Sequence, residues 1–340
     1  MLAAVFKGDG IVQVEERPVP KCKEENDVLL EVVSCGFCGS DLQALSIPPG
    51  QSYRKGVIMG HEIYGRVLER GSAVYHVAIG DYVAVDPVPK CGVCDFCKNG
   101  QPNYCLNWKS HHYGQQLDGG FAKYVLVKAE CLYKFKSRVS KEAGAQTEPL
   151  ACVLNGIKKV APSPLDNVVL YGAGPIGLLF LRCLLLFGVQ NLIVCETSRI
   201  RREYAQRCGA KYVIDADDRV EEKMLALWSE RASVVIDTVG IGPTVESGMP
   251  LLCPGGKYLI FGQNSNAEAT IRPAFINTNE IQVFGSFIGK HTSSDAVKLL
   301  GLDGFSAEKL VSHIFPVSEI QQAVDLAKSK TSARIVIVPD

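Results

Sequence analysis

The chain has 340 residues, which is long for one average domain and comfortable for two. Its 36 basic and 36 acidic residues balance, and this argues against a nucleic-acid partner or an anionic membrane surface, because both favour a basic face. No segment is typical of a secretory signal peptide. The longest apolar run, residues 176–189, spans about 14 residues and contains Arg182, so it is too short to cross a bilayer. With 13 cysteines and no secretion signal, we expect a cytoplasmic protein whose thiols bind metal or lie buried.

The first half of the chain is rich in short predicted strands. Apolar or alternating segments indicate the strands, and Gly60, Gly71 and Gly80 mark turns between them. This pattern predicts an all-β, barrel-like domain. The predicted strands cover residues 28–33, 63–68, 82–85 and 121–127.

From about Ser140 the pattern changes to alternating strands and helices. Ser140 is expected to cap a helix that runs on to Lys159 and is interrupted or kinked near Pro149. The alternation that follows predicts a parallel, doubly wound sheet. The expected strands are 167–171, 192–196, 212–214, 234–237, 258–261, 281–284 and 334–338, and the expected helices are 175–187, 200–208 and 317–328.

A strand, a glycine-rich turn and a helix follow one another at residues 168–187. Gly172, Gly174 and Gly177 have the Gly-x-Gly-x-x-Gly spacing of dinucleotide-binding turns. The first allows the tight turn, the second lets the backbone approach a pyrophosphate, and the third lets the helix pack on the strand. An ordinary turn can have the same spacing, but the flanking strand and helix favour a dinucleotide site.

Glu196 lies at the end of the next predicted strand, 24 positions after Gly172. This is close to the interval of about 20 residues expected for the acid that binds the ribose hydroxyls. Because a carboxylate there also repels a 2′-phosphate, NAD is favoured over NADP. The alternatives are a solvated residue at a strand end, or NADP held by nearby arginines at 199, 201 and 202.

Four cysteines with short, regular spacing stand in a loop rich in glycine and proline. Four thiolates so spaced can surround one zinc ion tetrahedrally and leave no open position, which is typical of a structural site. An iron–sulfur cluster is the competing interpretation, and disulfides are disfavoured by the expected compartment. The cysteines are Cys91, Cys94, Cys97 and Cys105.

A second candidate metal site is scattered along the chain. Cys38 follows a predicted strand, His61 and Glu62 are adjacent, and Glu148 lies far beyond them. One thiolate, one imidazole and one or two carboxylates suit a zinc ion that keeps a position for water or substrate. Spacing alone also fits a buried thiol and an unrelated His-Glu pair.

The motifs occur in one order: residues 36–41, the Gly60-His61-Glu62 segment, the four cysteines and the glycine turn at 172–177. In this order they resemble the zinc-dependent medium-chain alcohol dehydrogenases, especially the polyol branch that includes sorbitol and galactitol-1-phosphate dehydrogenases. The resemblance covers essentially the whole chain. It implies a mainly β, GroES-like catalytic domain and a Rossmann domain, with the active site in the cleft between them.

The same resemblance implies domain boundaries and partners. Residues 1–152 and 289–340 would form the catalytic domain, with a structural zinc lobe at about 89–107, and residues 153–288 would bind NAD. The family also implies a small-molecule substrate and a homodimer or homotetramer.

Matching residues imply roles at the two sites. Cys38, His61 and Glu62 correspond to ligands of the catalytic zinc, and Glu148 to a carboxylate that binds it directly or through water. Cofactor contacts are expected from the glycine turn and from positions beyond it. They are Gly172, Gly174, Pro175, Ile176, Gly177, Glu196, Arg201, Phe261, Gly262 and Phe287.

Residues beside the expected zinc site both follow and depart from the family pattern. Ser40 is expected to pass on the substrate proton, and Asp41 to orient the zinc-bound histidine. Many relatives carry a relay histidine five residues after the zinc cysteine, where this chain has Gln43. Since glutamine does not titrate, that relay step is expected to be absent or carried by water. Ile288 stands where sorbitol dehydrogenases carry an arginine near the substrate.

We therefore expect a zinc-dependent oxidoreductase with two zinc ions per chain. It would transfer a hydride between NAD and a secondary alcohol of a polyol, sugar alcohol or sugar phosphate. The alternatives are a dehydrogenase of an acidic sugar such as a hexonate, and a non-catalytic NAD-binding protein of the same fold. A zinc-ribbon nucleic-acid binder is opposed by the neutral charge and by the glycine turn.

Overall fold

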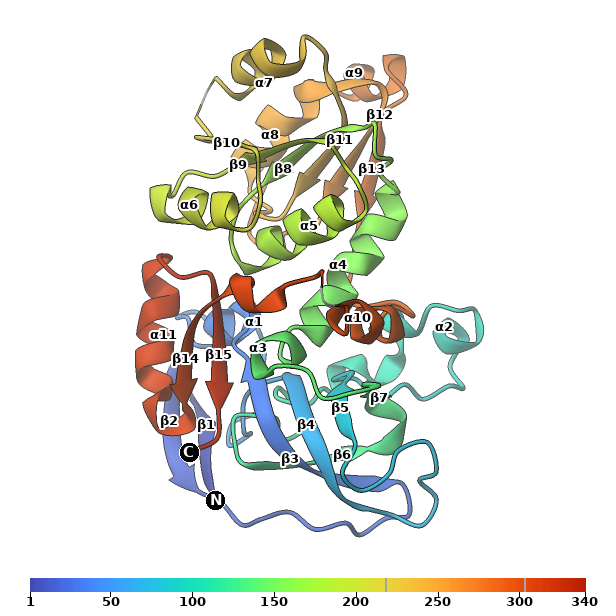
Figure 1. Cartoon of the computed structure of the whole chain (residues 1–340), viewed down its shortest axis with the longest axis vertical. Helices are drawn as coiled ribbons and strands as arrows, with labels where there is room; N and C mark the ends of the chain where they lie inside the picture. The colour runs from blue at the N-terminus through green and yellow to red at the C-terminus, as the bar shows by residue number, and fades with distance from the viewer. Residues whose placement is uncertain (218, 303) are drawn as a thin grey trace. The chain divides into compact units, whose positions relative to one another are not determined.

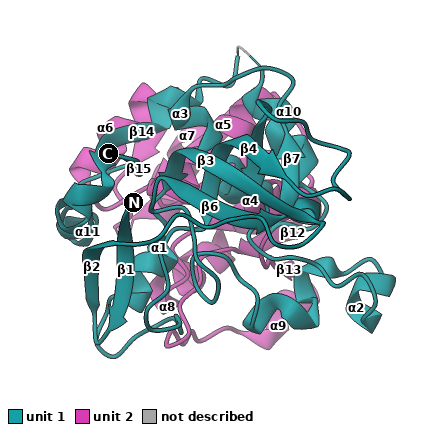
Figure 2. Cartoon of the chain, turned by 90° about the horizontal axis from the view of Figure 1, so that it is seen from below, with its two compact units in different colours: residues 1–151, 289–340 teal, residues 152–288 magenta. Residues whose placement is uncertain are grey.

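The chain forms two compact units in a computed structural model that describes residues 1–217, 219–302 and 304–340 (Figures 1 and 2). Unit 1 comprises Met1–Ala151 and Gly289–Asp340, and unit 2 comprises Cys152–Ile288. Each unit has its own sheet and its own apolar core. No helix of the described residues is long and apolar enough to span a membrane.

Unit 2 is built on a six-stranded sheet in the order β10-β9-β8-β11-β12-β13. All neighbouring strands in it are parallel, so the expected doubly wound parallel sheet is confirmed. The strands are β8 (Asn167–Tyr171), β9 (Asn191–Cys195), β10 (Tyr212–Ile214), β11 (Ala232–Asp237), β12 (Leu252–Ile260) and β13 (Gln282–Gly285). The helices between them are α5 (Pro175–Leu186), α6 (Arg199–Arg207), α7 (Val220–Trp228), α8 (Gly242–Gly248), η4 (Met249–Leu251) and α9 (Pro273–Thr278).

The central strand β8 explains why this sheet forms. All five of its residues are buried, as expected of a parallel strand whose two faces are both covered. The helix α5 that follows is also strongly apolar, and seven of its residues are buried. The sheet grows outward from β8 in both directions, first through β9 and β10 and then through β11 to β13. In sheets of this kind, ligands bind beyond the carboxyl ends of the strands at the point where the order reverses.

Unit 1 holds a seven-stranded sheet in the order β14-β15-β3-β4-β5-β7, with β6 paired to β3, and a separate β1-β2 pair. Its strands are β1 (Leu2–Gly8), β2 (Ile11–Glu16), β3 (Asp27–Gly36), β4 (Glu62–Arg70), β5 (Tyr82–Val85), β6 (Tyr124–Lys128), β7 (Leu132–Lys134), β14 (Val311–Pro316) and β15 (Arg334–Val338). Its helices are α1 (Gly39–Ala44), α2 (Asp95–Lys98), η1 (Pro102–Tyr104), η2 (Leu106–Lys109), η3 (Ala129–Cys131), α3 (Lys141–Gly144), α10 (Ser293–Leu300), η5 (Ala307–Leu310), η6 (Val317–Glu319) and α11 (Ile320–Ser329).

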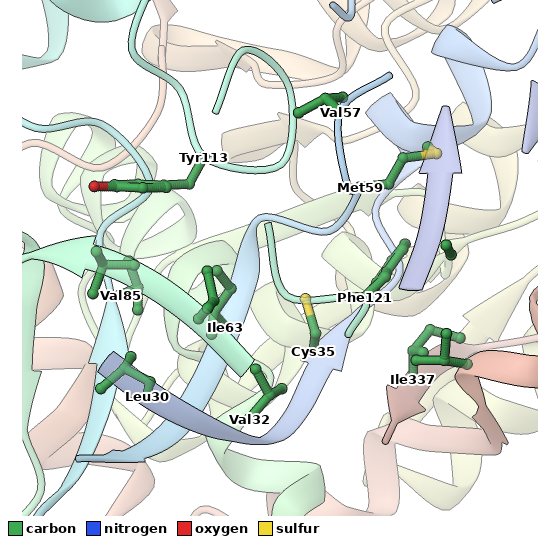
Figure 3. Packing of buried hydrophobic residues seen from close by; sticks show 14 of the residues in the cluster. Leu30, Val32, Cys35, Val57, Met59, Ile63, Val85, Tyr113, Phe121 and Ile337 are labelled. Carbon is green, nitrogen blue, oxygen red and sulfur yellow. The ribbon is translucent and has the colours of Figure 1, made fainter. Parts of the chain in front are cut away.

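The long strand β3 organises the core of unit 1. It pairs with β4, β6 and β15, so the last strand of the chain joins the sheet of the first half. Side chains from these strands pack together with Met59 and Phe121 from the loops (Figure 3). The packing ties residues 289–340 to the N-terminal part of the chain.

The helix expected after Ser140 is interrupted, but the interruption does not lie at the proline. Ser140 does cap a helix, because its hydroxyl accepts a hydrogen bond from the amide of Ala143 at 3.1 Å, but that helix, α3, ends at Gly144. A second helix, α4 (Thr147–Val160), begins after a short break. Pro149 lies in the first turn of α4, where a missing amide hydrogen costs no helical hydrogen bond. The interruption therefore precedes the proline.

Candidate metal centre and dinucleotide turn

Three of the expected zinc ligands come together where β3 ends and β4 begins. Gly36 at the end of β3 faces Glu62 at the start of β4 in the antiparallel register. Cys38 follows β3 as the residue before α1, and His61 directly precedes β4. The ligand atoms of Cys38, His61 and Glu62 all lie within 4.8 Å of one another. Residues distant in sequence thus form one compact donor cluster inside unit 1.

The charges within this cluster suit a cation. Burial raises the pKa of the Cys38 thiol, but attraction to His61 and a hydrogen bond with it lower the pKa below its usual value. Burial lowers the pKa of His61, but the charges of Asp41 and Cys38 outweigh this and raise it well above its usual value. A thiolate and an imidazolium are therefore favoured together, and a divalent ion can take the place of the imidazolium proton.

Asp41 faces the imidazole from α1. Its Oδ1 atom lies 3.6 Å from Nδ1 of His61, and its Oδ2 atom accepts a hydrogen bond from the amide of Cys38 at 2.9 Å. Its carboxylate is fully buried. The 3.6 Å contact is an ion-pair distance and not a hydrogen bond, and it places Asp41 beside the ring nitrogen that an orienting acid would face. Ser40 precedes it and is half-buried, and Gln43 lies on the same short helix.

Glu62 is paired with a buried arginine. Its Oε2 atom forms an ion pair with Arg334 at the start of β15, and both side chains are almost completely buried. The other oxygen, Oε1, is buried and makes no hydrogen bond within the described part of the chain. A buried carboxylate oxygen without a donor is costly, and a metal ion in the cluster would satisfy it. The donor set and this oxygen therefore fit zinc.

Glu148, the fourth expected ligand, belongs to helix α4. It is half-buried in the first turn of α4, and it is not one of the three residues whose ligand atoms lie within 4.8 Å. Its charge raises the pKa of Cys38 and of Cys35, so it is close enough to act on the site electrostatically. Whether it would bind a metal directly or through water stays a prediction.

The four clustered cysteines form a second donor set. The sulfur atoms of Cys91, Cys94, Cys97 and Cys105 all lie within 4.8 Å of one another. Cys105 Sγ accepts from the amide of Cys91 at 3.3 Å, and Cys91 Sγ accepts from the amide of Cys94 at 3.4 Å. Backbone amides of Cys97 and Leu106 lower the pKa of Cys94 to about 6. Four sulfurs with amide donors and no other ligand type fit a closed structural zinc site.

The glycine turn between β8 and α5 has the geometry that its spacing predicts. Gly172 has a φ of 94°, and a Cβ atom there would lie 2.5 Å from Thr238 Oγ1. A Cβ atom at Gly177 would lie 2.0 Å from the carbonyl oxygen of Gly172. Pro175 and Ile176 open α5, and the first amide groups of a helix have no carbonyl partner within it, so they can bind an anion. Glycine is therefore required here for the backbone path and for close packing.

Glu196 and Arg201 lie beside this turn. Glu196 Oε2 accepts a hydrogen bond from the amide of Ala173 at 2.8 Å, and Oε1 accepts from the amide of Ser198 at 2.9 Å. The guanidinium of Arg201 would lie 3.7 Å from a Cβ at Gly174. Its Nε atom is buried and has no hydrogen-bond partner among the described residues, which suits a polar ligand over the turn.

The remaining expected cofactor residues belong to two segments of unit 2. The amides of Phe261 and Gly262 both donate to the carbonyl oxygen of Asp237 at 2.9 Å, so both follow β12 near the end of β11. The carbonyl oxygen of Phe287 accepts from Asn155 Nδ2 at 3.4 Å. Both phenylalanine side chains are half-buried. These positions stay predictions as cofactor contacts.

Three residues near the donor cluster were not singled out from the sequence. They are Arg334, Tyr53 and His112, and isolated residues of these types carry no spacing signal. The ring of His112 packs edge-to-face on His61 at 5.4 Å. Burial and the charge of His61 lower the pKa of His112 to about 3, so it is neutral beside the cluster.

Known families and proteins match most of this chain. The alcohol dehydrogenase GroES-like domain family matches residues 24–137, and the zinc-binding dehydrogenase family matches residues 175–301. D-arabinitol dehydrogenase 1 of Uromyces fabae is 30% identical and covers 93% of this chain and 91% of its own length. D-xylulose reductase A of Aspergillus oryzae is 31% identical and covers 99% of this chain and 96% of its own.

A solved structure supports the same assignment. Galactitol-1-phosphate dehydrogenase of Escherichia coli superposes with a TM-score of 0.90 at 26% identity, covering 100% of both chains. The two family matches, the extended sequence similarity and the shared fold agree. The chain therefore belongs to the polyol branch of the zinc-dependent medium-chain alcohol dehydrogenases, a family of oxidoreductases.

Proposed function

We propose that this enzyme transfers a hydride between NAD and a secondary alcohol of a polyol, sugar alcohol or sugar phosphate. The observation that carries the proposal is the buried cluster of Cys38, His61 and Glu62, whose ligand atoms lie within 4.8 Å of one another. A binding protein that only held a dinucleotide would have no need of such a donor set. The names of two relatives, D-arabinitol dehydrogenase 1 and D-xylulose reductase A, support the substrate class.

The cluster would hold the catalytic metal. A zinc ion bound there would supply Lewis-acid chemistry, polarising the substrate hydroxyl and lowering its pKa. Cys38, His61 and Glu62 would be its protein ligands, with Glu148 nearby. Asp41 would keep the imidazole of His61 oriented, and Arg334 would hold Glu62 in place through their ion pair.

Ser40 is the proposed acceptor of the substrate proton. It lies two residues after Cys38, and its half-buried hydroxyl can take up a proton at Oγ and pass one on. Gln43, one turn further along α1, does not titrate. The proton would therefore leave through water or cofactor hydroxyls.

NAD would bind at the glycine turn of unit 2 and accept the hydride from the substrate carbon. The unpaired amides expected in the first turn of α5 suit its pyrophosphate. The buried carboxylate of Glu196 supports NAD, because its charge would oppose a 2′-phosphate. Arg202 is held by Asp215 and by carbonyl oxygens of residues 196 and 197, which leaves it less suited to bind that phosphate.

We further propose that the enzyme works in the cytoplasm as a homodimer or homotetramer, without a nucleic-acid or membrane partner. Its thirteen cysteines are all free thiols, which suits a reducing compartment. Strand β13 lies at the edge of the sheet of unit 2, and Val283 on it is exposed in the single chain. Both features support an interface between two copies of the chain at this strand.

The substrate class is tested by a screen that follows NADH absorbance. Pentitols, hexitols, sugar alcohol phosphates and sugar acids would be offered with NAD and with NADP. The proposal expects turnover of a polyol or its phosphate with NAD. A hexonate as the sole substrate would favour the acidic-sugar alternative, and an absence of turnover with every compound offered would contradict the proposal.

The metal assignment is tested with a matched pair of cysteine variants. Wild-type protein is expected to hold two zinc ions per chain, and Cys38→Ser and Cys97→Ser one each. Cys38→Ser should lose more than about 100-fold in kcat, which exceeds the usual effect of losing only an outer-shell partner. Cys97→Ser should mainly lower the melting temperature, because its site holds a loop together.

Metal analysis, kinetics and thermal denaturation check these outcomes. A Cys38→Ser enzyme with normal turnover would contradict the zinc role.

A further inference from the structure

A buried tyrosine hydroxyl lies between two residues of the proposed site. Tyr53 stands in the loop before β4, is 7% exposed, and packs its ring on Phe6 with 5.9 Å between ring centres. Its hydroxyl donates to Asp41 Oδ1 at 2.9 Å and lies 3.4 Å from Ser40 Oγ. Tyr53 therefore contacts both the acid that faces His61 and the proposed proton acceptor.

The phenol has one proton, and the two contacts compete for it. The contact with Asp41 is shorter and ends on a charged oxygen, so the proton belongs on that side. The amide of Cys38 donates to the other oxygen of the same carboxylate at 2.9 Å. Both oxygens of Asp41 thus accept hydrogen bonds, and these fix the rotation of the carboxylate about the Cβ–Cγ bond. Its Oδ1 atom then stays 3.6 Å from Nδ1 of His61.

The phenol oxygen keeps its lone pairs for Ser40. With its own proton on Asp41, Tyr53 can only accept from the serine hydroxyl, which would turn the Ser40 proton toward the phenol. The lone pairs of Ser40 Oγ would then be left for a proton that arrives from substrate. One side chain thus influences the orientation of the metal histidine and the direction of the serine hydroxyl.

We propose that Tyr53 is a positioning residue for the metal centre, which holds Asp41 against His61 and directs the hydroxyl of Ser40. This inference rests on the proposed function, because it assigns Tyr53 a task at that same site. A tyrosine that merely filled the core would need some partner for its hydroxyl, but it would not affect metal affinity or turnover. The two roles therefore differ in what their loss would change.

The test replaces Tyr53 by phenylalanine, which keeps the ring contact with Phe6 and removes only the hydroxyl. Loss of an outer-shell partner typically costs about 10- to 100-fold in metal affinity or activity. We expect Tyr53→Phe to lose zinc from the Cys38 site to a competing chelator at about 10-fold lower chelator concentration. We also expect kcat to fall about 10-fold with KM changed less, and the absorption bands of the cobalt-substituted site to shift.

The matched control is Tyr64→Phe. Tyr64 is fully buried in the same unit, but its hydroxyl contacts the backbone of Val139 at 3.2 Å, away from the donor cluster. Both variants lose one buried phenol hydroxyl, so a purely structural cost should appear in both melting temperatures. Only Tyr53→Phe should alter zinc affinity, the cobalt spectrum and kcat.

Two results would overturn the inference, and they can be told apart. If wild-type zinc resists the chelator no better than Cys38→Ser, the metal site itself is wrong and the proposed function fails with the inference. If wild type binds two zinc ions but Tyr53→Phe matches Tyr64→Phe in zinc affinity, cobalt spectrum and kcat, the site stands and the positioning role is refuted.

Discussion

Arg334 and Glu62 form a buried ion pair at the edge of the proposed metal centre. Arg334 is 2% exposed, and adjacent Gly36 has no room for a side chain, because a Cβ there would meet both charged groups. Such a pair adds little net stability when complete, since both charges were removed from water. Removing one partner of the pair destabilises the protein, because the remaining charge stays buried without its partner.

We predict that Arg334→Leu destabilises the metal-free protein by about 3–5 kcal/mol, because it leaves Glu62 as an uncompensated buried carboxylate. Urea denaturation after zinc removal measures this loss. Arg199→Leu is the control, since it breaks an exposed pair with Glu203 and should cost no more than about 1 kcal/mol. If both variants lost the same free energy of unfolding, breaking the buried Glu62–Arg334 pair would cost no more than breaking an exposed pair.

Without the family resemblance, which supplied the scattered zinc ligands, the sequence could identify residues at this scale only where their spacing carried a signal. The four cysteines and three glycines have fixed intervals, so their convergence could be predicted locally. Tyr53 and Arg334 have no such interval. They reach the site because the loop before β4 and the last strand β15 fold back onto the end of β3, and that pairing is not visible from either segment alone.

At the scale of elements, buried strands were predicted more accurately than helix breaks. The strands at 82–85, 167–171, 212–214 and 334–338 have the predicted bounds, because continuous apolar runs end abruptly at polar or glycine residues. The break between α3 and α4 was predicted near Pro149, but it precedes the proline, which fits inside the first turn of α4. The strands β1, β2, β7 and β14 were not predicted, and β14 has a half-buried pattern throughout.

The pairing of β3 with β6 includes a cross-strand ion pair with a defined pH response. Asp27 faces Lys128 in the register, and the Lys128 Nζ atom lies 2.8 Å from Asp27 Oδ1. Burial raises the pKa of Asp27, but hydrogen bonds from Lys128 and from two backbone amides outweigh this and lower it. Burial lowers the pKa of Lys128, but its acidic partners raise it overall.

We predict that Asp27→Asn destabilises unit 1 by about 1–3 kcal/mol at pH 7, as expected for hydrogen bonds to a charged group. Since the folded-state pKa of Asp27 is depressed, its contribution is present above the unfolded value of about 3.9 and is lost as pH falls through the folded value. The difference between variant and wild type should therefore shrink below about pH 4. Urea denaturation across pH measures it, with exposed Glu25→Gln as control. A difference that stayed constant down to pH 2 would exclude the charge as its cause.

At the scale of the whole molecule, the two units divide the proposed ligands between them. All the proposed zinc ligands lie in Met1–Ala151, and the glycine turn with Glu196 and Arg201 lies in Cys152–Ile288. Because each unit has its own sheet and its own apolar core, a ligand can stabilise one unit more than the other. A ligand that binds only the folded form of one unit stabilises that unit first.

This division predicts where NAD protects the chain. At 100 times its dissociation constant, NAD should stabilise its binding unit by about 2.7 kcal/mol, which corresponds to about 100-fold slower exchange for amides that exchange through unfolding of that unit. Exchange of the amides of β8 and β9 should therefore slow more than that of β4, as followed by hydrogen exchange and mass spectrometry.

Removal of zinc should affect unit 1 instead, and exchange should become faster mainly around β4 and the four cysteines. NADP at the same concentration should protect β8 less, because the buried Glu196 carboxylate opposes its extra phosphate. Equal protection of β4 and β8 by NAD would show that the units respond as one body, and stronger protection by NADP would reverse the proposed cofactor preference.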